Sequence, residues 1–189
     1  MCLRASHTFG KQKEHDMMNA KMTVGEFEIS LTEEHISHFI SDLTDDASHA
    51  ELLDYLAKNT NNTSLLAAVI NNDGVSDDTV KYLLENKTSD LCLWVDVINS
   101  NKVRELITED QLIQLLSQSD TISSNVAYYI EGFEECDSVR ISEWICENSS
   151  DATVKRLAEN ISAPNKVLKK LLEHENRLIS EVAKKSLEY

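Results

Sequence analysis

The sequence predicts an all-α protein built from short helices. Turn residues are scarce, with 4 Gly and 1 Pro among 189 residues, and only 6% of the residues are aromatic. A protein made of many short strands would need more of both kinds. The apolar content of 41% is sufficient to bury a core. A segment also repeats: residues 76–86 read SDDTVKYLLEN and residues 150–160 read SDATVKRLAEN, identical at eight of eleven positions. The repeat indicates a tandem helical architecture.

Each copy of this segment predicts one amphipathic helix. Ser76 is a favoured N-cap residue, and the aspartates after it suit the positive end of the helix dipole. Val80, Leu83 and Leu84 follow at i, i+3 and i+4, so they share one face. Asn86 is expected to end the helix, because asparagine tolerates the left-handed conformation that helix C-termini often need.

Similar helix ends recur along the chain. Asn59, Asn72, Asn86 and Asn99 follow one another every 13 or 14 residues, so two helices make a unit of about 27 residues. Single helices this short are marginal in water, and a pair cannot cover its own apolar face. The sequence therefore predicts an α-solenoid of about nine or ten short paired helices.

The chain is expected to form a flexible tail over residues 1–22 and a single helical-repeat domain over residues 23–189. Glu26 to Leu31 alternates apolar and polar residues and predicts one short extended segment that caps the stack. A first helix is expected over 32–43, and a second from Ser48 with the capping box Ser48-x-x-Glu51. Further helices are expected over 63–71, 77–86, 89–99, 109–118, 122–131, 138–147, 151–159, 164–173 and 177–187.

The C-terminal unit carries a family resemblance. Its residues are Ala158-Glu-Asn160, Pro164, Val167-Leu168, Leu171-Leu172, His174-Glu175 and Val182-Ala183. Together they resemble the variant leucine-rich repeat, a relative of the HEAT-like α-solenoids, over one unit from Leu157 to Leu187; upstream, where proline is missing, the match weakens. The resemblance implies a right-handed superhelix with a concave binding surface. The cysteine cluster that holds an iron–sulfur centre in some variant repeats is absent, so no cofactor is implied.

Charge restricts the partners that the protein can have. The net charge is −15, and residues 23–150 contain 25 acidic and 6 basic residues. Such a surface repels phosphate backbones and anionic membranes, so we expect no direct nucleic acid and no membrane partner. No stretch approaches the roughly 18 apolar residues of a membrane span. Four cysteines without C-x-x-C spacing indicate reduced thiols, and we expect a cytoplasmic protein that is monomeric on its own.

Signatures of catalysis are missing from the sequence. It contains no G-x-S-x-G, H-E-x-x-H, G-x-x-x-x-G-K-[ST] or G-x-G-x-x-G motif. Cys136 and Cys146 lie in an acidic stretch, which raises thiol pKa values. We therefore expect no enzyme activity, no cofactor and no metal site.

One acidic group is not explained by helix formation. Glu131, Glu134, Glu135 and Asp137 gather near a predicted helix C-terminus, where the helix dipole disfavours negative charge. Other acids, such as Asp77 and Asp78, fall in predicted first turns, where the dipole favours them. Because local stability does not account for the four, they are candidate partner-binding residues.

Aromatic residues beside this group are further candidates. The helix near 91–98 is expected to bury one face, formed by Leu91, Trp94, Val95 and Ile98. Leu93 and Val97 lie off that face, so the helix is central or partly partner-facing, with Trp94 and Asp96 as possible contacts. In the next unit Tyr129 is assigned to the core with Val126 and Ile130, whereas Tyr128 lies off it and is the better anchor.

Together these features favour an acidic protein-binding module. The most concrete version is an immunity or antitoxin-type inhibitor that neutralises a basic, nuclease-like partner, because a nuclease site is cationic and an acidic surface can occupy it. One alternative is a general scaffold or adaptor whose acidity only maintains solubility. A HEAT-like enzyme is a third, and would need a pocket around a carboxylate such as Asp96.

Overall fold

A computed structural model describes residues 20–24, 27–31, 35, 36, 38, 40 and 47–188. These residues are helical apart from one β-hairpin and the connecting turns, which confirms the all-α class in its coarse form. The chain divides into two compact units, Met1–Thr79 and Val80–Tyr189. None of the described helices has the length and apolar character needed to cross a membrane.

The first unit begins with the hairpin. Strand β1 (Ala20–Val24) pairs antiparallel with β2 (Phe27–Leu31), in a register that joins Val24 to Phe27. The extended segment expected over 26–31 therefore forms a strand from Phe27 onward. Its partner was not predicted, and it includes residues 20–22 of the expected tail. The remainder of that tail, residues 1–19, lies outside the described residues.

Two helices follow in the first unit. Helix α2 (Ala47–Asn59) packs on α3 (Thr63–Ile70), as expected for a pair. Because the helical backbone already begins at Ala47, Ser48 lies inside α2 and not at its N-cap position, so the predicted capping box is wrong. Of the helix expected over 32–43, residues 35, 36, 38 and 40 are helical, and the others lie outside the described residues.

The remaining helices correspond closely to the predicted ranges, with one exception. They are α4 (Asp77–Asn86), within which the division of units falls, α5 (Leu91–Val97), α6 (Asn101–Leu106), α7 (Glu109–Leu116), α8 (Asp120–Tyr128), the 3-10 turn η1 (Ile130–Gly132), α9 (Ser138–Asn148), α10 (Asp151–Glu159), α11 (Asn165–Leu171) and α12 (Arg177–Ser186). The exception is α6, which was not predicted. Its six residues bury only Val103 and are too short to show a helical period.

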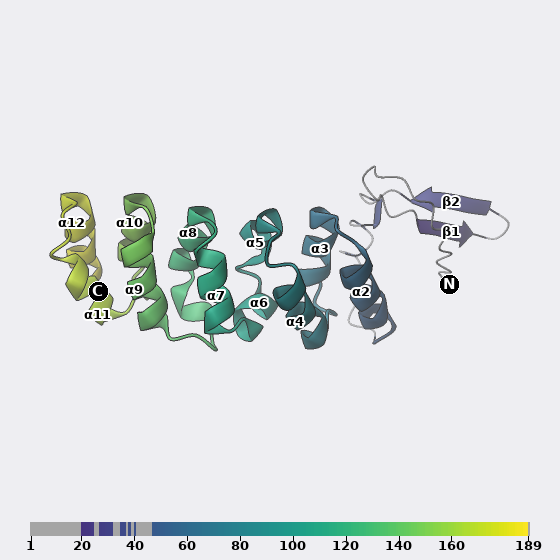
Figure 1. The fold of residues 1–189 in the computed structure, drawn as a ribbon, viewed down its shortest axis with the longest axis horizontal. Helices are drawn as coiled ribbons and strands as arrows, with labels where there is room; N and C mark the ends of the chain where they lie inside the picture. Colours follow the sequence, from purple (N-terminus) through teal and green to yellow (C-terminus); the bar gives the residue numbers. More distant parts are fainter. Residues whose placement is uncertain are drawn as a thin grey trace. The chain divides into compact units, whose positions relative to one another are not determined.

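Helices of the second unit lie in two rows (Figure 1). Helix α10 contacts α8 on one side and α12 on the other, and α5 contacts α8. The intervening helices α7, α9 and α11 contact one another in the same order. Elements that alternate along the chain therefore lie next to each other, so α8, α9 and α10 each pack on helices from the preceding and following pairs.

The two copies of the repeated segment bury the predicted face. Val80, Leu83 and Leu84 in α4 are buried, as are their equivalents in α10, Val154, Leu157 and Ala158. The asparagines act differently from the prediction. Asn160 has an extended backbone (φ −80°, ψ 112°) and not a left-handed one. Asn86 instead donates from its side chain to the carbonyl of Tyr82 over 2.8 Å, which satisfies an orphan carbonyl at the helix end.

Polar contacts between helices follow a regular sequence separation. In the first unit Asn72 donates to the carbonyl of Ile40, 32 residues earlier, over 2.6 Å. In the second unit Asn125 donates to Val95, 30 residues earlier, and Ser186 donates to Ala158, 28 residues earlier. Each of these bonds links one helical pair to the pair before it. The contacts therefore repeat with a period close to the unit length predicted from the sequence.

Candidate functional site

The acidic loop, residues 131–137, connects the end of α8 to the start of α9. Ile130 in η1 is 1% exposed and Phe133 is 3% exposed, so two apolar side chains anchor this short connection in the core. Between and after these anchors, Glu131, Glu134 and Glu135 are exposed. The loop is thus held in place while it presents its carboxylates to solvent.

These three glutamates have no partner among the residues that the structure describes. In the part of the chain that the structure describes, none of Glu131, Glu134 and Glu135 forms a side-chain hydrogen bond or an ion pair. Some acids elsewhere are paired: Glu143 binds Lys170 and, over 3.3 Å, Lys166. The acidic loop therefore carries charge that no nearby cation of the described chain neutralises through an ion pair.

Asp137 differs from the three glutamates and corrects the sequence interpretation. It is the N-cap residue of α9, and its Oδ1 accepts hydrogen bonds from the backbone N–H groups of Val139 (2.9 Å) and Arg140 (3.4 Å). Its own backbone N–H donates to Glu109 over 3.0 Å. Helix capping thus explains this aspartate. The expectation that helix formation does not account for it is wrong.

Two tyrosines lie immediately before the loop. Tyr128 is 60% exposed, in agreement with its expected position off the core face. Tyr129 is 42% exposed, although the sequence assigned it to the core. The two rings form an edge-to-face pair with centroids 4.7 Å apart, so Tyr129 packs mainly on another exposed side chain. We call Tyr128, Tyr129, Glu131, Glu134 and Glu135 the tyrosine–acid surface.

Arg104, in the unpredicted helix α6, contacts residues of this surface and of the acidic loop. Its guanidinium lies 5.5 Å from the centroid of the Tyr129 ring, a cation–π distance. A Cβ on Gly132 would overlap the same guanidinium, so the absence of a side chain there permits the approach. The backbone carbonyl of Arg104 also accepts from the N–H of Glu134 over 3.3 Å. Sequence reasoning missed this residue, although it is one of the few cations in an acidic region.

The loop after α10 lies beside the end of α8. Asn160 donates through Nδ2 to the carbonyls of Ala127 and Tyr128, over 3.0 Å in each case. The next residue, Ile161, is 72% exposed. A large apolar side chain is thereby exposed one residue from a direct contact with Tyr128, so apolar area near the tyrosine–acid surface extends onto a second loop.

The remaining predicted contacts lie on α5, and one of them is corrected. Trp94 is 0% exposed and its indole N–H donates to the carbonyl of Lys87 over 2.8 Å, so it is a core residue and cannot contact a partner. The expected core face of this helix is also wrong in part, because Leu93 and Val97 are fully buried whereas Leu91 and Val95 are half-buried. The wrong face was chosen because this helix is apolar on most sides.

Asp96 is exposed, as its predicted role requires. It is linked to the tyrosine-bearing helix through its neighbour: the carbonyl of Val95 accepts from Asn125 on α8 over 3.1 Å. The structure therefore brings the helix that carries Asp96 alongside α8, which ends at Tyr128.

The cysteines near the surface are poor nucleophiles. Burial, followed by the carboxylates of Glu109 and Glu135, raises the pKa of the Cys136 thiol to about 11. Burial also raises the pKa of Cys146 to about 11. Both stay protonated near neutral pH. Among the described residues there is no group of three His, Cys, Asp or Glu side chains that could hold a metal ion.

Comparison with known proteins identifies no relative. No protein-family model, no curated protein and no solved structure matches the chain.

Proposed function

We propose that the protein is an α-solenoid of the variant leucine-rich or HEAT-like kind that binds a basic protein through the tyrosine–acid surface. In its most concrete version it is an immunity or antitoxin-type inhibitor that neutralises a nuclease-like partner. The observation that carries the proposal is the group of three exposed glutamates, which have no partner among the described residues, on an anchored loop beside two exposed tyrosines.

The repeated inter-helix contacts support the solenoid part of the proposal. In a solenoid each repeat contacts only its neighbours. Hydrogen bonds between pairs, at separations of 28 to 32 residues, have this property. The row of α8, α10 and α12 beside the row of α7, α9 and α11 is the arrangement expected of stacked helical pairs.

The chemistry of the surface supports a basic partner. Glutamates that are not paired with any residue in the described part of the chain need break no ion pair there when they meet a cation. The backbone of a loop held by Ile130 and Phe133 also loses little conformational freedom on binding. Tyr128 and Tyr129 add large contact areas with few rotatable bonds, as in typical interface anchors. The net charge of −15 would further accelerate the encounter with a cationic protein.

An inhibitor of a nuclease is the version that uses all of these features. A nuclease surface that holds a phosphate backbone is positive, so an acidic surface can occupy it in place of the nucleic acid. The aromatic pair would supply the affinity that charge alone loses at physiological salt. Salt should therefore weaken the complex without abolishing it.

A scaffold or adaptor is the second candidate function, favoured by exposed apolar residues that are not part of the tyrosine–acid surface. Ile161, Leu172 and Leu178 are each more than one third exposed. In that case partners would dock on these residues, and the glutamates would only maintain solubility. A HEAT-like enzyme is the third candidate function, but none of the surface residues described above forms a catalytic group.

Charge reversal distinguishes the first two candidates. The variant Glu131→Lys/Glu134→Lys/Glu135→Lys is compared with Glu173→Lys/Glu175→Lys/Glu188→Lys, which changes three exposed acids elsewhere by the same charge. Each is used to capture proteins from native lysate at low and high salt, with identification by mass spectrometry. We expect the wild type and the control to retain a basic, nucleic-acid-acting protein and the loop variant to lose it. Equal retention by the loop variant would favour the scaffold.

A further inference from the structure

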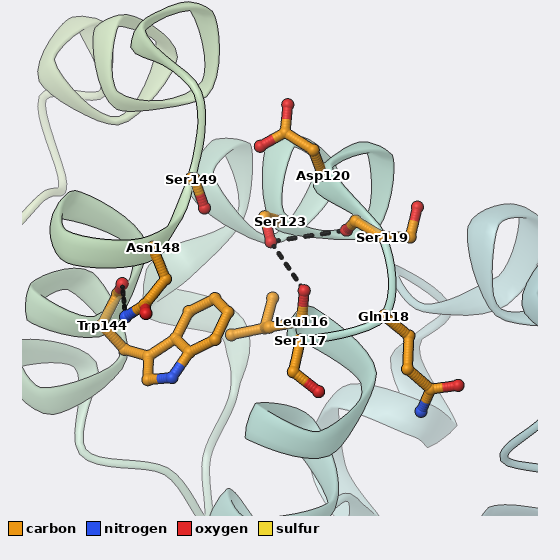
Figure 2. A pocket seen from close by; sticks show the side chains of 9 residues that line it. All are labelled: Leu116, Ser117, Gln118, Ser119, Asp120, Ser123, Trp144, Asn148 and Ser149. Carbon is orange, nitrogen blue, oxygen red and sulfur yellow. Dashed lines mark hydrogen bonds between the residues drawn. The ribbon is translucent and has the colours of Figure 1, made fainter.

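The second unit also contains a polar pocket of about 300 Å³, apart from the tyrosine–acid surface. It lies where α7 ends, α8 begins and α9 ends (Figure 2). Its lining includes Leu116, Ser119, Asp120, Trp144, Asn148 and Ser149. None of these residues was singled out by the sequence, and none belongs to the tyrosine–acid surface. The volume is at the lower limit of ligand pockets, about 300 to 1,000 Å³, so it suits a side chain better than a whole cofactor.

One wall of the pocket is aromatic. Figure 2 shows the indole of Trp144 on one side and the Ser119–Asp120 end of α8 on the other. Trp144 is half-buried, and in the described part of the chain its indole N–H has no hydrogen-bond partner. The other tryptophan, Trp94, is fully buried and hydrogen-bonded. Tryptophan offers the most favourable ring for a cation.

Several polar groups of the pocket are not used internally. Asn148 donates through Nδ2 to the carbonyl of Trp144 over 2.9 Å, which leaves its Oδ1 as an acceptor. The Oγ of Ser149 is buried without a partner among the described residues. Ser123, in contrast, is already bonded to the carbonyls of Leu116 and Ser119, at 3.4 Å each.

Asp120 supplies a permanent negative charge at the rim. Its carboxylate accepts from the backbone N–H of Ser150 (3.0 Å), from the Ser150 hydroxyl (2.7 Å) and from the Thr153 hydroxyl (3.0 Å). In Figure 2 it points away from Trp144, so it acts on a ligand through its field and not by contact. No lysine, arginine or histidine lines the pocket.

Helix ends around the pocket also favour a cation. The C-terminal ends of α7 and α9 line the pocket, including their C-cap residues Ser117 and Ser149. A helix C-terminus carries partial negative charge. The N-terminus of α8 is present too, but Asp120 in its first turn offsets that positive end.

From this geometry we infer that the pocket receives a cationic side chain, arginine or lysine, of the partner protein. The head group would stack on Trp144 and donate to Asn148 Oδ1, with Asp120 compensating its charge. The inference rests on the proposed function, because a basic partner supplies such side chains. It deepens that function by adding a specific contact away from the tyrosine–acid surface.

The experiment uses the whole protein without any partner. N-acetyl-arginine methylamide is titrated into the protein, and the indole N–H signals of Trp144 and Trp94 are followed by NMR. N-acetyl-citrulline methylamide, which has nearly the same shape without the charge, is the matched probe. We expect a saturable shift of the Trp144 signal with the arginine compound, no shift of Trp94, and binding of the citrulline compound weaker by about fivefold or more.

Two variants sharpen this test. Trp144→Leu should abolish binding of the arginine compound. Asp120→Asn, which removes the charge and replaces one of the two oxygen acceptors with an NH2 group, should weaken it by about fivefold; circular dichroism verifies the fold of each. Equal shifts with the citrulline compound, or no saturable shift of Trp144, would overturn the inference.

The outcome is separable from that of the proposed function. The arginine titration should be unchanged in the Glu131→Lys/Glu134→Lys/Glu135→Lys variant if the pocket is a separate site. A failed titration together with charge-dependent partner capture would remove the pocket inference alone. A successful titration together with capture that ignores the glutamates would remove the proposed function of the tyrosine–acid surface alone.

Discussion

The hydroxyl of Thr153 donates a hydrogen bond to the carboxylate of Asp120 over 3.0 Å, from the first turn of α10 to the first turn of α8. The other copy of the repeated segment makes the same kind of contact: Thr79 donates to Asp54 over 3.1 Å, from α4 to α2. Both threonines are buried, at 0% and 1% exposure. The threonine of the repeat therefore joins one helical pair to the preceding one.

Removal of this contact should destabilise the fold. Thr153→Val keeps the shape of the side chain but removes the donor, so we expect a loss of about 1 kcal/mol in the free energy of unfolding. Urea denaturation measures it. Asp110→Asn is the control, since Asp110 is an exposed first-turn acid of α7 and should cost no more than about 0.5 kcal/mol. Equal losses for the two variants would show that the threonine contact contributes nothing specific.

The contribution of Asp120 to stability should depend on pH. Burial alone would raise its pKa, but the hydrogen bonds from Ser150 and Thr153 hold the pKa of Asp120 below its ordinary value of 3.8. A lowered pKa in the folded state stabilises the protein above the ordinary pKa, and this stabilisation is lost as the pH falls through the lowered value. The difference in unfolding free energy between the wild type and Asp120→Asn should therefore be larger at neutral pH than at about pH 2.5. A difference that grows on acidification would contradict this sign.

Gly132 should be required for the position of Arg104. The variant Gly132→Ala places a methyl group where the guanidinium lies, and the flexible side chain is expected to leave the Tyr129 ring. We expect a cost of about 0.5 to 1 kcal/mol, the range of a partly exposed cation–π contact, and a changed ring signal of Tyr129 in NMR spectra.

A double-mutant cycle provides the control for this change. In an Arg104→Ala background the guanidinium is already gone, so Gly132→Ala should lose most of its effect on unfolding and on the Tyr129 signal. If the alanine costs the same in both backgrounds, the backbone and not the arginine requires glycine.

Cysteine alkylation should be selective in the native protein. With pKa values of about 11, Cys136 and Cys146 are thiolate to only about one part in a thousand at pH 8. Cys92 is exposed and should react first among the cysteines in the described residues. Peptide mapping after brief iodoacetamide treatment tests this order, and rapid native labelling of Cys136 would contradict it. Denaturant should make all of them react.

Much of the fold could be predicted because its signals are local. Caps such as Ser150 and the i, i+3, i+4 spacing of Val154, Leu157 and Ala158 are properties of a few consecutive residues, and the structure confirms the helix and its buried face. Helix α6 escaped because six residues with one buried side chain have no measurable period.

The candidate site was predicted in part, for a similar reason. Glu131, Glu134 and Glu135 were chosen from charge and position alone, and the structure finds them exposed and unpaired in the part it describes. Asp137 was misread because helix α9 begins directly after it, a boundary that the sequence located only approximately. Arg104 and the Trp144 pocket could not be found, since each depends on residues from other helices.

By itself, the sequence determined the helical class, most helix positions, the repeated segment and the acidity of the loop. Only the tertiary structure decided that Trp94 is buried while Trp144 borders a pocket, and that Tyr129 forms an edge-to-face pair with Tyr128 and lies 5.5 Å from the Arg104 guanidinium. The physical reason is that local patterns specify which residues can share a helix face. Which of two similar faces is covered depends on the neighbouring helices, and their packing is a property of the whole unit.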